Sequence, residues 1–333
     1  MPAPVNILLI RIKAIGDVVL TLPAVAALRE NYPSVKITFL TSQENTTLLQ
    51  GFKDVDEVIP LERAALRSKN PCRVLSRFFS LLRRLRAGKF DLVVDFQSNG
   101  ESAWLTRMTG AKQRWGSVYN PGQGWAYTRR VARLKNVHPA DGNLELLRQC
   151  GLTISASQNK FILPDDALAT ARKFFTDNRL NPDERTLFLQ PFTSSAHKNW
   201  PLKNYIELAM QWQARGGQII FGGGPDDRDA LRSVTEAGFI VSAGVPLLVT
   251  GGLLKLSTLA VGGDTGAMHL AVALGRRVVM LMHARDAGSP YPFGQPGWAI
   301  IPAKTTQMSE ISLATVWAEC ERIVNAPTGS ASC

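Results

Sequence analysis

The chain reads Gly262-Gly263-Asp264-Thr265-Gly266-Ala267-Met268-His269-Leu270-Ala271 at the point that decides its fold. The apolar run 256–261 before this stretch suits a buried strand, and the residues from Leu270 onward follow a helical pattern. A strand that turns on glycines into a helix directs free N–H groups and a partial positive charge toward one point. The stretch therefore predicts an anion site, with phosphate as the simplest ligand.

Three side chains of this stretch are candidates for contact with such a ligand. Asp264 occupies the position expected for an N-cap, and Thr265 and His269 are four residues apart, so on a helix they share a face. A purely structural interpretation fits the motif equally well, since Asp264 can be only a cap and His269 only a packing residue. The rest of the chain has to distinguish these two interpretations.

Length and composition are those of a globular protein long enough for two domains. The chain has 333 residues, 45% hydrophobic and 20% charged, enough for two domains of roughly 150 residues. The N-terminus lacks a signal-peptide pattern, and no apolar run approaches the roughly 20 residues that span a bilayer. We therefore expect a cytosolic protein or one attached to a membrane surface. The four cysteines, Cys72, Cys150, Cys320 and Cys333, form no CxxC or Cys/His cluster, which argues against a structural zinc site, and in a reducing compartment they are not expected to form disulfides.

Positive charge is concentrated in the first half of the chain. Residues 1–150 contain 22 Lys and Arg against 12 Asp and Glu, a net charge of +10, whereas residues 151–333 contain 16 against 15, a net charge of +1. The segment 63–89 holds nine basic residues and no acidic one. Such a segment indicates contact with a polyanion, which can be a nucleic acid, an anionic lipid surface or a phosphorylated substrate. The alternative is a solvated helix face, although such faces usually mix both signs of charge.

Apolar residues and arginines interleave within the basic segment. The apolar members are Phe78, Phe79, Leu81, Leu82 and Leu85. Their spacing among the arginines predicts an amphipathic basic helix that can lie on a membrane surface. An ordinary helix packed on a sheet with its arginines outward explains the same apolar residues, and both interpretations can hold together.

Strands and helices are expected to alternate in the first half. The expected strands are 5–10, 35–40, 57–59 and 90–96, and the expected helices are 18–28, 102–108 and 141–150. Pro23 predicts a kink or break in the first helix. Residues 113–137 predict a loop or short strands, and the domain junction is expected near 155–185.

The second half repeats this alternation. The expected strands are 186–190, 218–221, 256–261 and 277–282, with helices ending near 215 and 236, a connection over 239–256, a helix after the opening motif and a last helix over 309–325. Both halves together predict an α/β protein with two doubly wound parallel sheets and a cleft between them.

Four loops fall at the expected carboxyl ends of strands, where open α/β sheets bind ligands. They are residues 14–17, 193–198, 222–227 and 263–269. Together they suit a nucleotide sugar, whose diphosphate and ribose hydroxyls need donors and acceptors respectively. The diphosphate candidates are Thr193, Ser194, Lys198, Thr265 and the helix N-terminus near Asp264, and the ribose candidates are Asp226 and Asp227. Neither a GxGxxG nor a Walker GxxxxGK[ST] motif is present, which disfavours dinucleotide-binding, kinase and NTPase functions.

Four motifs in this order resemble glycosyltransferase family 9, the ADP-heptose:lipopolysaccharide heptosyltransferases of Gram-negative bacteria. They are Ile10-Arg11 with Ile15-Gly16-Asp17-Val18-Val19-Leu20-Thr21-Leu22-Pro23-Ala24, then His197-Lys198-Asn199-Trp200-Pro201, then Gly223-Gly224-Pro225 with its acidic pair, then 264–271. The resemblance implies a GT-B fold of two Rossmann-like domains facing a central cleft. It implies an acceptor domain over 1–165, a nucleotide-sugar domain over 166–308 and a helix over 309–326 that crosses back to the first domain.

The resemblance also implies roles for single residues. Asp17 matches the family's proposed general base, which an inverting transfer needs beside the acceptor hydroxyl. The catalytic Lys198 matches a contact of the leaving diphosphate, where positive charge is most useful. The other positions that match the donor site are Thr193, Ser194, Asp264, Thr265, Gly266 and His269. Asp17 has a structural alternative as the cap of the helix from Val18. No metal or cofactor besides the donor ADP-heptose is implied.

The family's acceptors are phosphorylated lipid A-core molecules embedded in the membrane, which gives the basic segment a function. The residues expected to contact the acceptor or the anionic inner-membrane surface are Arg63, Arg67, Arg77, Arg83, Arg84 and Arg86. The protein is then expected in the cytoplasm, peripheral on the inner face of the inner membrane, with no nucleic acid partner.

One region departs from the family pattern. Members commonly carry a Phe-Gly-Pro-Thr type turn after the strand ending at 281, where this chain has Met282-His283-Ala284-Arg285-Asp286, and 289–294 keeps only a loose likeness to Gly-Pro-Tyr-Gly. This region lies near the donor base and sugar, so a relative using another nucleotide sugar or acceptor is the first alternative. A non-catalytic polyanion-binding protein is the second, and the intact motifs weigh against it.

Overall fold

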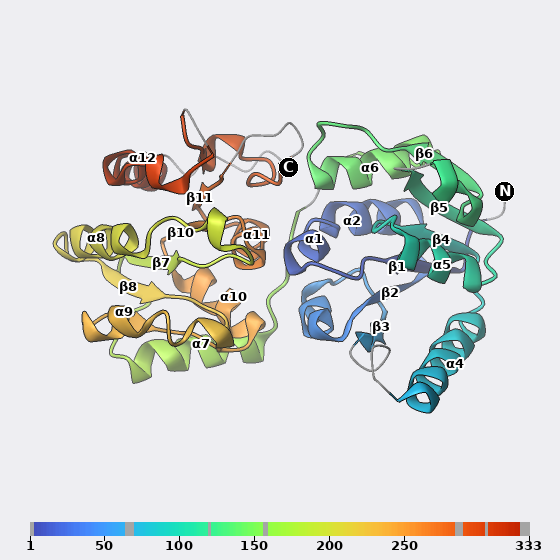
Figure 1. The fold of residues 1–333 in the computed structure, drawn as a ribbon, viewed down its shortest axis with the longest axis horizontal. Coiled ribbons are helices and arrows are strands. Elements are labelled where there is room, and N and C mark those ends of the chain that lie inside the picture. Colours follow the sequence, from blue (N-terminus) through green and yellow to red (C-terminus); the bar gives the residue numbers. More distant parts are fainter. Residues whose placement is uncertain are drawn as a thin grey trace. The chain divides into compact units, whose positions relative to one another are not determined.

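The computed structural model describes residues 3–63, 70–118, 121–155, 159–283, 289–303 and 306–326. Contacts within the chain divide it into two units, Met1–Gln158 and Asn159–Cys333. Each unit contains one six-stranded sheet with helices packed against it (Figure 1).

The first unit is built on a parallel sheet with the order β3-β2-β1-β4-β5-β6. Its strands are β1 (Asn6–Ile10), β2 (Lys36–Ser42), β3 (Glu57–Leu61), β4 (Leu92–Asp95), β5 (Gln113–Val118) and β6 (Arg129–Ala132). Its helices are α1 (Ile15–Val19), α2 (Leu22–Asn31), α4 (Pro71–Ala87), α5 (Gly100–Met108) and α6 (Pro139–Gln149), with 3-10 helices η1 (Gln43–Asn45), η2 (Thr47–Gly51) and η3 (Pro121–Ala126).

Strand β1 lies in the middle of this sheet because it is apolar on both faces. Leu8 and Ile10 pack with Leu85 of α4 and Leu105 of α5, whereas the alternate residues point to the opposite face and are also fully buried. A strand covered on both faces reads as an uninterrupted apolar run, which is how the sequence predicts it. It pairs in parallel with β2 and β4, so Ile7 lies between partners on both neighbouring strands.

The second unit has a parallel sheet with the order β12-β11-β10-β7-β8-β9. Its strands are β7 (Thr186–Gln190), β8 (Gln218–Phe221), β9 (Ile240–Val241), β10 (Leu259–Gly263), β11 (Val278–Leu281) and β12 (Ala299–Ile300). Its helices are α7 (Asp165–Asp177), α8 (Leu202–Gln213), α9 (Arg232–Glu236), α10 (Leu247–Leu256), α11 (Gly266–Ala273) and α12 (Leu313–Asn325), with 3-10 helices η4 (Ala196–Lys198), η5 (Pro225–Asp227), η6 (Pro296–Trp298) and η7 (Met308–Glu310).

Numbered within its own unit, each sheet has the strand order 3-2-1-4-5-6. The winding reverses between the first and fourth strands of such a sheet, and the crevice at their carboxyl ends is where ligands bind. This place lies between β1 and β4 in the first unit and between β7 and β10 in the second. The predicted doubly wound parallel fold is confirmed, and the loops after these four strands are the natural location of a site.

One detail of the predicted elements is wrong. The helix expected over 18–28 is two helices, α1 and α2, and Pro23 does not cause the break. Pro23 lies in the first turn of α2, where a backbone N–H has no intrahelical partner and its loss costs little. The prediction of a loop or short strands over 113–137 is confirmed, because the short strands β5 and β6 lie there with η3 between them.

Helix α10 occupies most of the segment expected to be a connection. Its two central glycines, Gly251 and Gly252, lower helix propensity, and Gly252 allows close packing on α7. A Cβ atom on Gly252 would lie 2.5 Å from the Cβ of Ala171 and 3.0 Å from the carbonyl oxygen of Ala167. The tertiary contact thus requires residues that a local pattern interprets as helix breakers.

The last helix contributes to the core of the second unit. Val316, Cys320 and Ile323 of α12 are buried in one cluster with Trp212 of α8 and Val279 of β11. Ser312 caps this helix by accepting a hydrogen bond from the N–H of Thr315 at 3.1 Å. The packed face of α12 therefore lies on the second unit.

Candidate active site

The loop after β1 holds the predicted base, Asp17, through one of its two carboxylate oxygens. Arg11 Nη2 lies 2.7 Å from Asp17 Oδ2, and the N–H of Ala14 donates to the same oxygen at 3.1 Å. Oδ1 accepts no hydrogen bond from the residues that the structure describes, and the side chain is 38% exposed. A carboxylate with one oxygen fixed and the other available suits proton abstraction from a hydroxyl. The structural alternative also holds in part, because the bond from Ala14 caps α1.

The loop after β4 supports the loop after β1. Arg11 Nη1 donates to the carbonyl of Phe96 at 2.6 Å, so the guanidinium bridges Phe96 and Asp17. Gln97 Oε1 accepts from the N–H groups of Ile12 and Lys13, at 3.1 and 3.2 Å. These contacts join the two strands that flank the crevice of the first sheet. Sequence reasoning names Arg11 only as part of a motif and gives Gln97 no role.

Buried Asp95 at the end of β4 fixes the loop that carries Gln97. Its carboxylate accepts from the N–H groups of Gln97 and Ser98 at 2.9 and 2.8 Å and from the hydroxyl of Tyr127 at 2.8 Å. Burial raises the pKa of Asp95, while the hydrogen bonds from Ser98, Tyr127 and Gln97 act in the opposite direction. The network fixes the turn that presents Gln97 to the N–H groups of Ile12 and Lys13.

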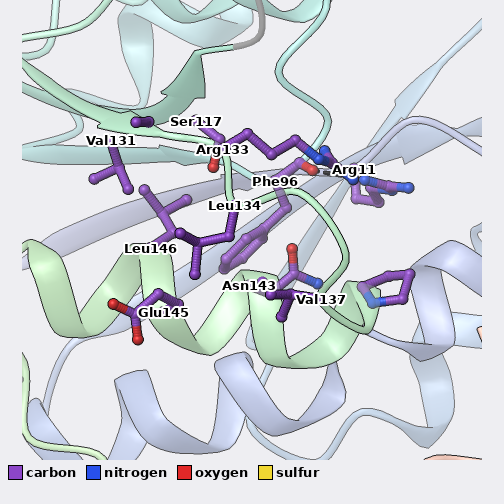
Figure 2. A pocket seen from close by; sticks show the side chains of 13 residues that line it. Arg11, Phe96, Ser117, Val131, Arg133, Leu134, Val137, Asn143, Glu145 and Leu146 are labelled. Carbon is purple, nitrogen blue, oxygen red and sulfur yellow. Dashed lines mark hydrogen bonds between the residues drawn. The ribbon is translucent and has the colours of Figure 1, made fainter. Parts of the chain in front are cut away.

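A pocket opens beside Arg11, lined by the end of β4, by β6 and by α6 (Figure 2). Phe96 and Asn143 contribute to its wall, and the side chain of Arg133 extends along it toward Arg11. Burial and the charge of Arg11 lower the pKa of Arg133, whereas Asp17 acts in the opposite direction. The guanidinium groups of Arg11 and Arg133 and the carboxylate of Asp17 therefore lie on the same side of the first unit. Because the two positive charges exceed the one negative charge, this place suits an anionic group next to Asp17.

In the second unit, Asp264 brings together Lys198 and His269. His269 Nε2 lies 3.0 Å from Asp264 Oδ1, and Lys198 Nζ lies 3.7 Å from Asp264 Oδ2. Burial by itself would raise the pKa of Asp264, but the hydrogen bond and charge of His269 and the charge of Lys198 outweigh it, so the pKa is lowered. The carboxylate thus stays ionised and orients both partners at the start of α11.

The N-cap of α11 is Thr265 and not Asp264, which corrects the predicted cap. The helix begins at Gly266, and the hydroxyl of Thr265 accepts from the N–H of Met268 at 3.4 Å. Asp264 precedes the cap, which frees its carboxylate for side-chain partners. The N–H groups of Gly266 and Ala267 have no intrahelical acceptor, as in any first turn, and they face the same end as Lys198. His269 is 3% exposed, and its Nδ1 has no partner among the described residues.

The loop after β7 lies against the loop after β10, as the strand order requires. A Cβ atom on Gly263 would lie 2.5 Å from Cγ2 of Thr193 and 3.5 Å from the carbonyl oxygen of Lys198, so only glycine fits there. The hydroxyl of Thr193 bonds within its own loop, to Ser195 and to Asn199 Oδ1 at 2.9 Å each. Thr193 therefore shapes the loop that presents Lys198, and Ser194 is exposed on it.

The predicted ribose contacts differ in their surroundings. Asp227 accepts a hydrogen bond from the N–H of Gly224 at 2.7 Å and so stabilises the turn after β8. Asp226 is exposed. The prediction of ribose contact stays a prediction for both, with Asp226 as the carboxylate that this turn leaves available.

Most described members of the predicted acceptor set pair with carboxylates of their own unit. Arg63 binds Glu101 at 3.1 Å, Arg77 binds Glu62 at 3.1 Å, and Arg84 binds Glu57 at 3.3 Å. Arg86 donates to the carbonyl of Met108 at 3.4 Å. Arg83 is exposed without a hydrogen bond or ion pair to any described residue, and Arg67 lies outside the described residues. The acidic partners come from outside 63–89, so the segment is less uniformly positive in three dimensions than in sequence.

The described residues contain neither a candidate metal cluster nor a helix that could span a membrane. No cluster of three or more His, Cys, Asp or Glu side chains with metal-binding geometry lies within them. None of their helices has the length and apolar character needed to cross a bilayer.

Comparison with known proteins decides the family. The model of glycosyltransferase family 9 (heptosyltransferase) matches residues 78–298. The chain belongs to glycosyltransferase family 9. As a family 9 member it is a glycosyltransferase, and the resemblance predicted from the four motifs is confirmed.

Curated relatives of this family 9 enzyme are similar over most of their length. The chain is 23% identical to lipopolysaccharide heptosyltransferase 3 of Escherichia coli over 283 residues, covering 81% of each chain. It is 25% identical to lipopolysaccharide heptosyltransferase 1 of Escherichia coli K12 over 295 residues, covering 85% of this chain and 89% of the relative.

Solved structures of the family share the fold. The family 9 glycosyl transferase from Veillonella parvula superposes with a TM-score of 0.84 at 22% identity, covering 96% of this chain and 97% of that one. Escherichia coli heptosyltransferase WaaC, solved with ADP-2-deoxy-2-fluoro heptose, gives a TM-score of 0.76 at 24% identity, covering 95% and 99%. The two Rossmann-order sheets are those of a GT-B fold, as predicted.

Proposed function

We propose that this family 9 glycosyltransferase moves heptose from ADP-heptose to a phosphorylated lipid A-core acceptor, with inversion at the anomeric carbon. The observation that carries the proposal is the cluster of Lys198, Asp264 and His269 at the start of α11, in a chain whose curated relatives are lipopolysaccharide heptosyltransferases. A cation beside a helix N-terminus suits the diphosphate of a nucleotide sugar.

The proposed reaction divides the work between the units. In the first unit, Asp17 Oδ1 takes the proton of the acceptor hydroxyl while the oxygen of that hydroxyl bonds to the anomeric carbon of heptose. The bond between that carbon and the β-phosphate oxygen breaks with its electron pair going to ADP. In the second, Lys198 and the N–H groups of α11 stabilise the charge that develops on the departing diphosphate. Attack opposite the leaving group gives the inverted product, and we propose that no metal ion or other cofactor takes part.

The chemical nature of the acceptor determines where in the cell we propose that the enzyme works. Because a lipid A-core acceptor is anchored in the bilayer, we propose that the enzyme works in the cytoplasm, peripheral on the inner face of the inner membrane. The first unit carries the excess of basic residues that such a surface attracts.

The proposal is tested by incubating the protein with ADP-heptose and a lipid A-core acceptor and following heptose incorporation. Asp17→Asn keeps an acceptor oxygen for Ala14 and so preserves the cap, yet it removes the base. We expect transfer to fall by roughly 10² or more, with ADP binding unchanged. Lys198→Met should reduce both donor affinity and turnover. Transfer by the Asp17 variant at a near-normal rate would exclude Asp17 as the base.

A relative that uses another nucleotide sugar is the second candidate, and the departure at 282–294 favours it. Residues 284–288 of that region lie outside the described residues. Thermal shift with ADP, UDP and GDP separates the two candidates, because only a nucleotide that binds the folded state raises the melting temperature. Stabilisation by UDP or GDP but not by ADP would select the second candidate.

A further inference from the structure

Helix α4 carries an exposed row of two apolar residues and one basic residue, Leu75, Phe79 and Arg83, which is called the outward row below. Leu75 and Phe79 are each 56% exposed, although most large apolar side chains of the first unit are buried. Residues 75, 79 and 83 succeed one another at intervals of four, so Leu75, Phe79 and Arg83 share one side of the helix. Figure 1 shows that the N-terminal end of α4 extends away from the rest of its unit.

The other sides of α4 are already occupied within the first unit. Phe78 packs on Trp104 with ring centroids 5.2 Å apart, and Leu85 is fully buried in the core. On the flank, Arg77 and Arg84 pair with Glu62 and Glu57. The packed side and its flanking ion pairs attach the helix to its sheet. Within the described part of the chain, Phe79 contacts the ring of its neighbour Phe78, with centroids 5.8 Å apart, but stays largely exposed, and Arg83 has no ion pair.

We propose that this outward row docks α4 on the surface of an anionic lipid bilayer. Leu75 and Phe79 enter the boundary between headgroups and acyl chains, and Arg83 contacts the phosphate of the headgroups. An exposed aromatic and an exposed aliphatic side chain gain free energy only in an apolar medium, and the adjacent guanidinium selects an anionic one. This inference rests on the proposed function, which places the acceptor in the bilayer. It assigns the contact to Arg83 and the two apolar residues in place of the ion-paired Arg77 and Arg84.

The experiment measures flotation of the full-length protein with vesicles of phosphatidylethanolamine and phosphatidylglycerol, and with vesicles of phosphatidylcholine alone. We expect binding to the anionic vesicles only. Leu75→Ser with Phe79→Ser should lower the bound fraction at a given lipid concentration, shifting the partition by roughly tenfold or more, and this loss should persist at low salt. Arg83→Glu should weaken binding most at low salt, where charge is least screened.

Matched controls use equally exposed residues of the second unit. Met210 and Ile162 are 51% and 41% exposed, and Arg172 is exposed on α7. Met210→Ser with Ile162→Ser, and Arg172→Glu, should leave vesicle binding unchanged. Equal losses in the control and test variants, or binding that depends on salt but not on Leu75 and Phe79, would overturn the proposal.

A second measurement separates this inference from the proposed function. Transfer of heptose to a soluble core-sugar acceptor needs no bilayer, and it should be the same in wild type and in the variant that combines Leu75→Ser with Phe79→Ser. Normal transfer without vesicle binding would refute the docking surface alone. Vesicle binding that needs Leu75 and Phe79, in a protein without heptosyl transfer, would refute the proposed function and support the docking surface. Preferential binding of RNA over vesicles would contradict the bilayer as the occupant.

Discussion

The two oxygens of the Asp17 carboxylate have different surroundings, and Arg11 is the cause. One guanidinium nitrogen binds Asp17 and another binds the carbonyl of Phe96, so the planar group sets the direction of the carboxylate relative to the sheet. Arg11 is therefore a positioning residue for the proposed base. A lysine keeps the charge but lacks the planar fork with which Arg11 reaches both Asp17 Oδ2 and the carbonyl oxygen of Phe96.

We expect Arg11→Lys to lower kcat by roughly tenfold while the KM for the nucleotide sugar stays unchanged, because orientation and not donor binding is lost. Steady-state kinetics test this, and added guanidinium should partly restore the turnover of Arg11→Ala. The control is Arg29→Lys, because Arg29 also bridges a carbonyl and a carboxylate, those of Val35 and Asp56. Wild-type turnover in Arg11→Lys, or an equal loss in Arg29→Lys, would contradict the positioning role.

The lowered pKa of Asp264 predicts how its contribution to stability depends on pH. A carboxyl whose pKa is depressed in the folded state stabilises the fold above the unfolded value of about 4, and this contribution disappears as the pH falls through the lower folded value. Asp264→Asn should thus cost about 1–2 kcal/mol at pH 6 and less at pH 3. Urea unfolding of both proteins at the two pH values measures the difference. A gap that stays constant or grows toward pH 3 would show that ionic partners do not stabilise Asp264.

Single residues of the site were predictable where a motif carries them. Asp17, Lys198 and His269 follow from short stretches with chemical meaning, and the structure brings Lys198 and His269 to one carboxylate. Gln97 was not predictable, because its role depends on the adjacency of β1 and β4, which are some eighty residues apart in sequence. The cap assignment failed for another reason: Asp and Thr are both good N-caps, and a one-residue difference in helix start decides between them.

Among the elements, β4 and its following turn depend on buried Asp95. Asp95→Ala leaves two N–H groups and the hydroxyl of Tyr127 without their acceptor, so we expect a loss of about 2–4 kcal/mol in the free energy of unfolding. Chemical denaturation measures it. Asp91→Ala is the matched control, because Asp91 also accepts two N–H bonds, from Val5 and Asn6, but at the surface where water can replace it. Its cost should stay below about 1 kcal/mol, and equal losses would contradict the role of burial.

The buried strands were the most predictable elements and the helix contacts the least. A strand covered on both faces must be apolar throughout, so β1, β7 and β8 appear directly in the sequence. The contact between α7 and α10 does not, because Gly252 serves an approach to a helix about eighty residues earlier in the chain. Local propensity disfavours this glycine in a helix, and close packing against α7 requires it.

At the scale of the whole molecule, two units of the same topology differ in charge. The first carries the basic excess and the proposed base, and the second carries the predicted nucleotide site. ADP at about one hundred times its Kd should stabilise the protein by about 2.7 kcal/mol.

With ADP bound, hydrogen exchange should show the strongest protection in residues 190–199 and 262–270. Inorganic phosphate at the same concentration is the control and should protect these segments less. Protection strongest within Met1–Gln158 would contradict the assignment of the nucleotide to the second unit.

The alternation of strands and helices sufficed to predict the architecture, because βαβ connections leave few topologies for a parallel sheet. Donor identity was less predictable, since it depends on the side chains around the nucleotide base. The sequence departs from its family there, at 282–294.

The strand register of the first sheet bears on how the protein is made. The central strand, β1, pairs with β4, so its pairing requires that residues as late as Leu92 have been made. All strands of this sheet nevertheless precede residue 159. At roughly 5–20 residues per second, translating the remainder occupies a ribosome for on the order of ten seconds or longer. The N-terminal half can thus attain its final hydrogen bonding while still tethered to the ribosome. We therefore expect a nascent chain that is stalled during synthesis of the second unit to hold a complete first sheet already.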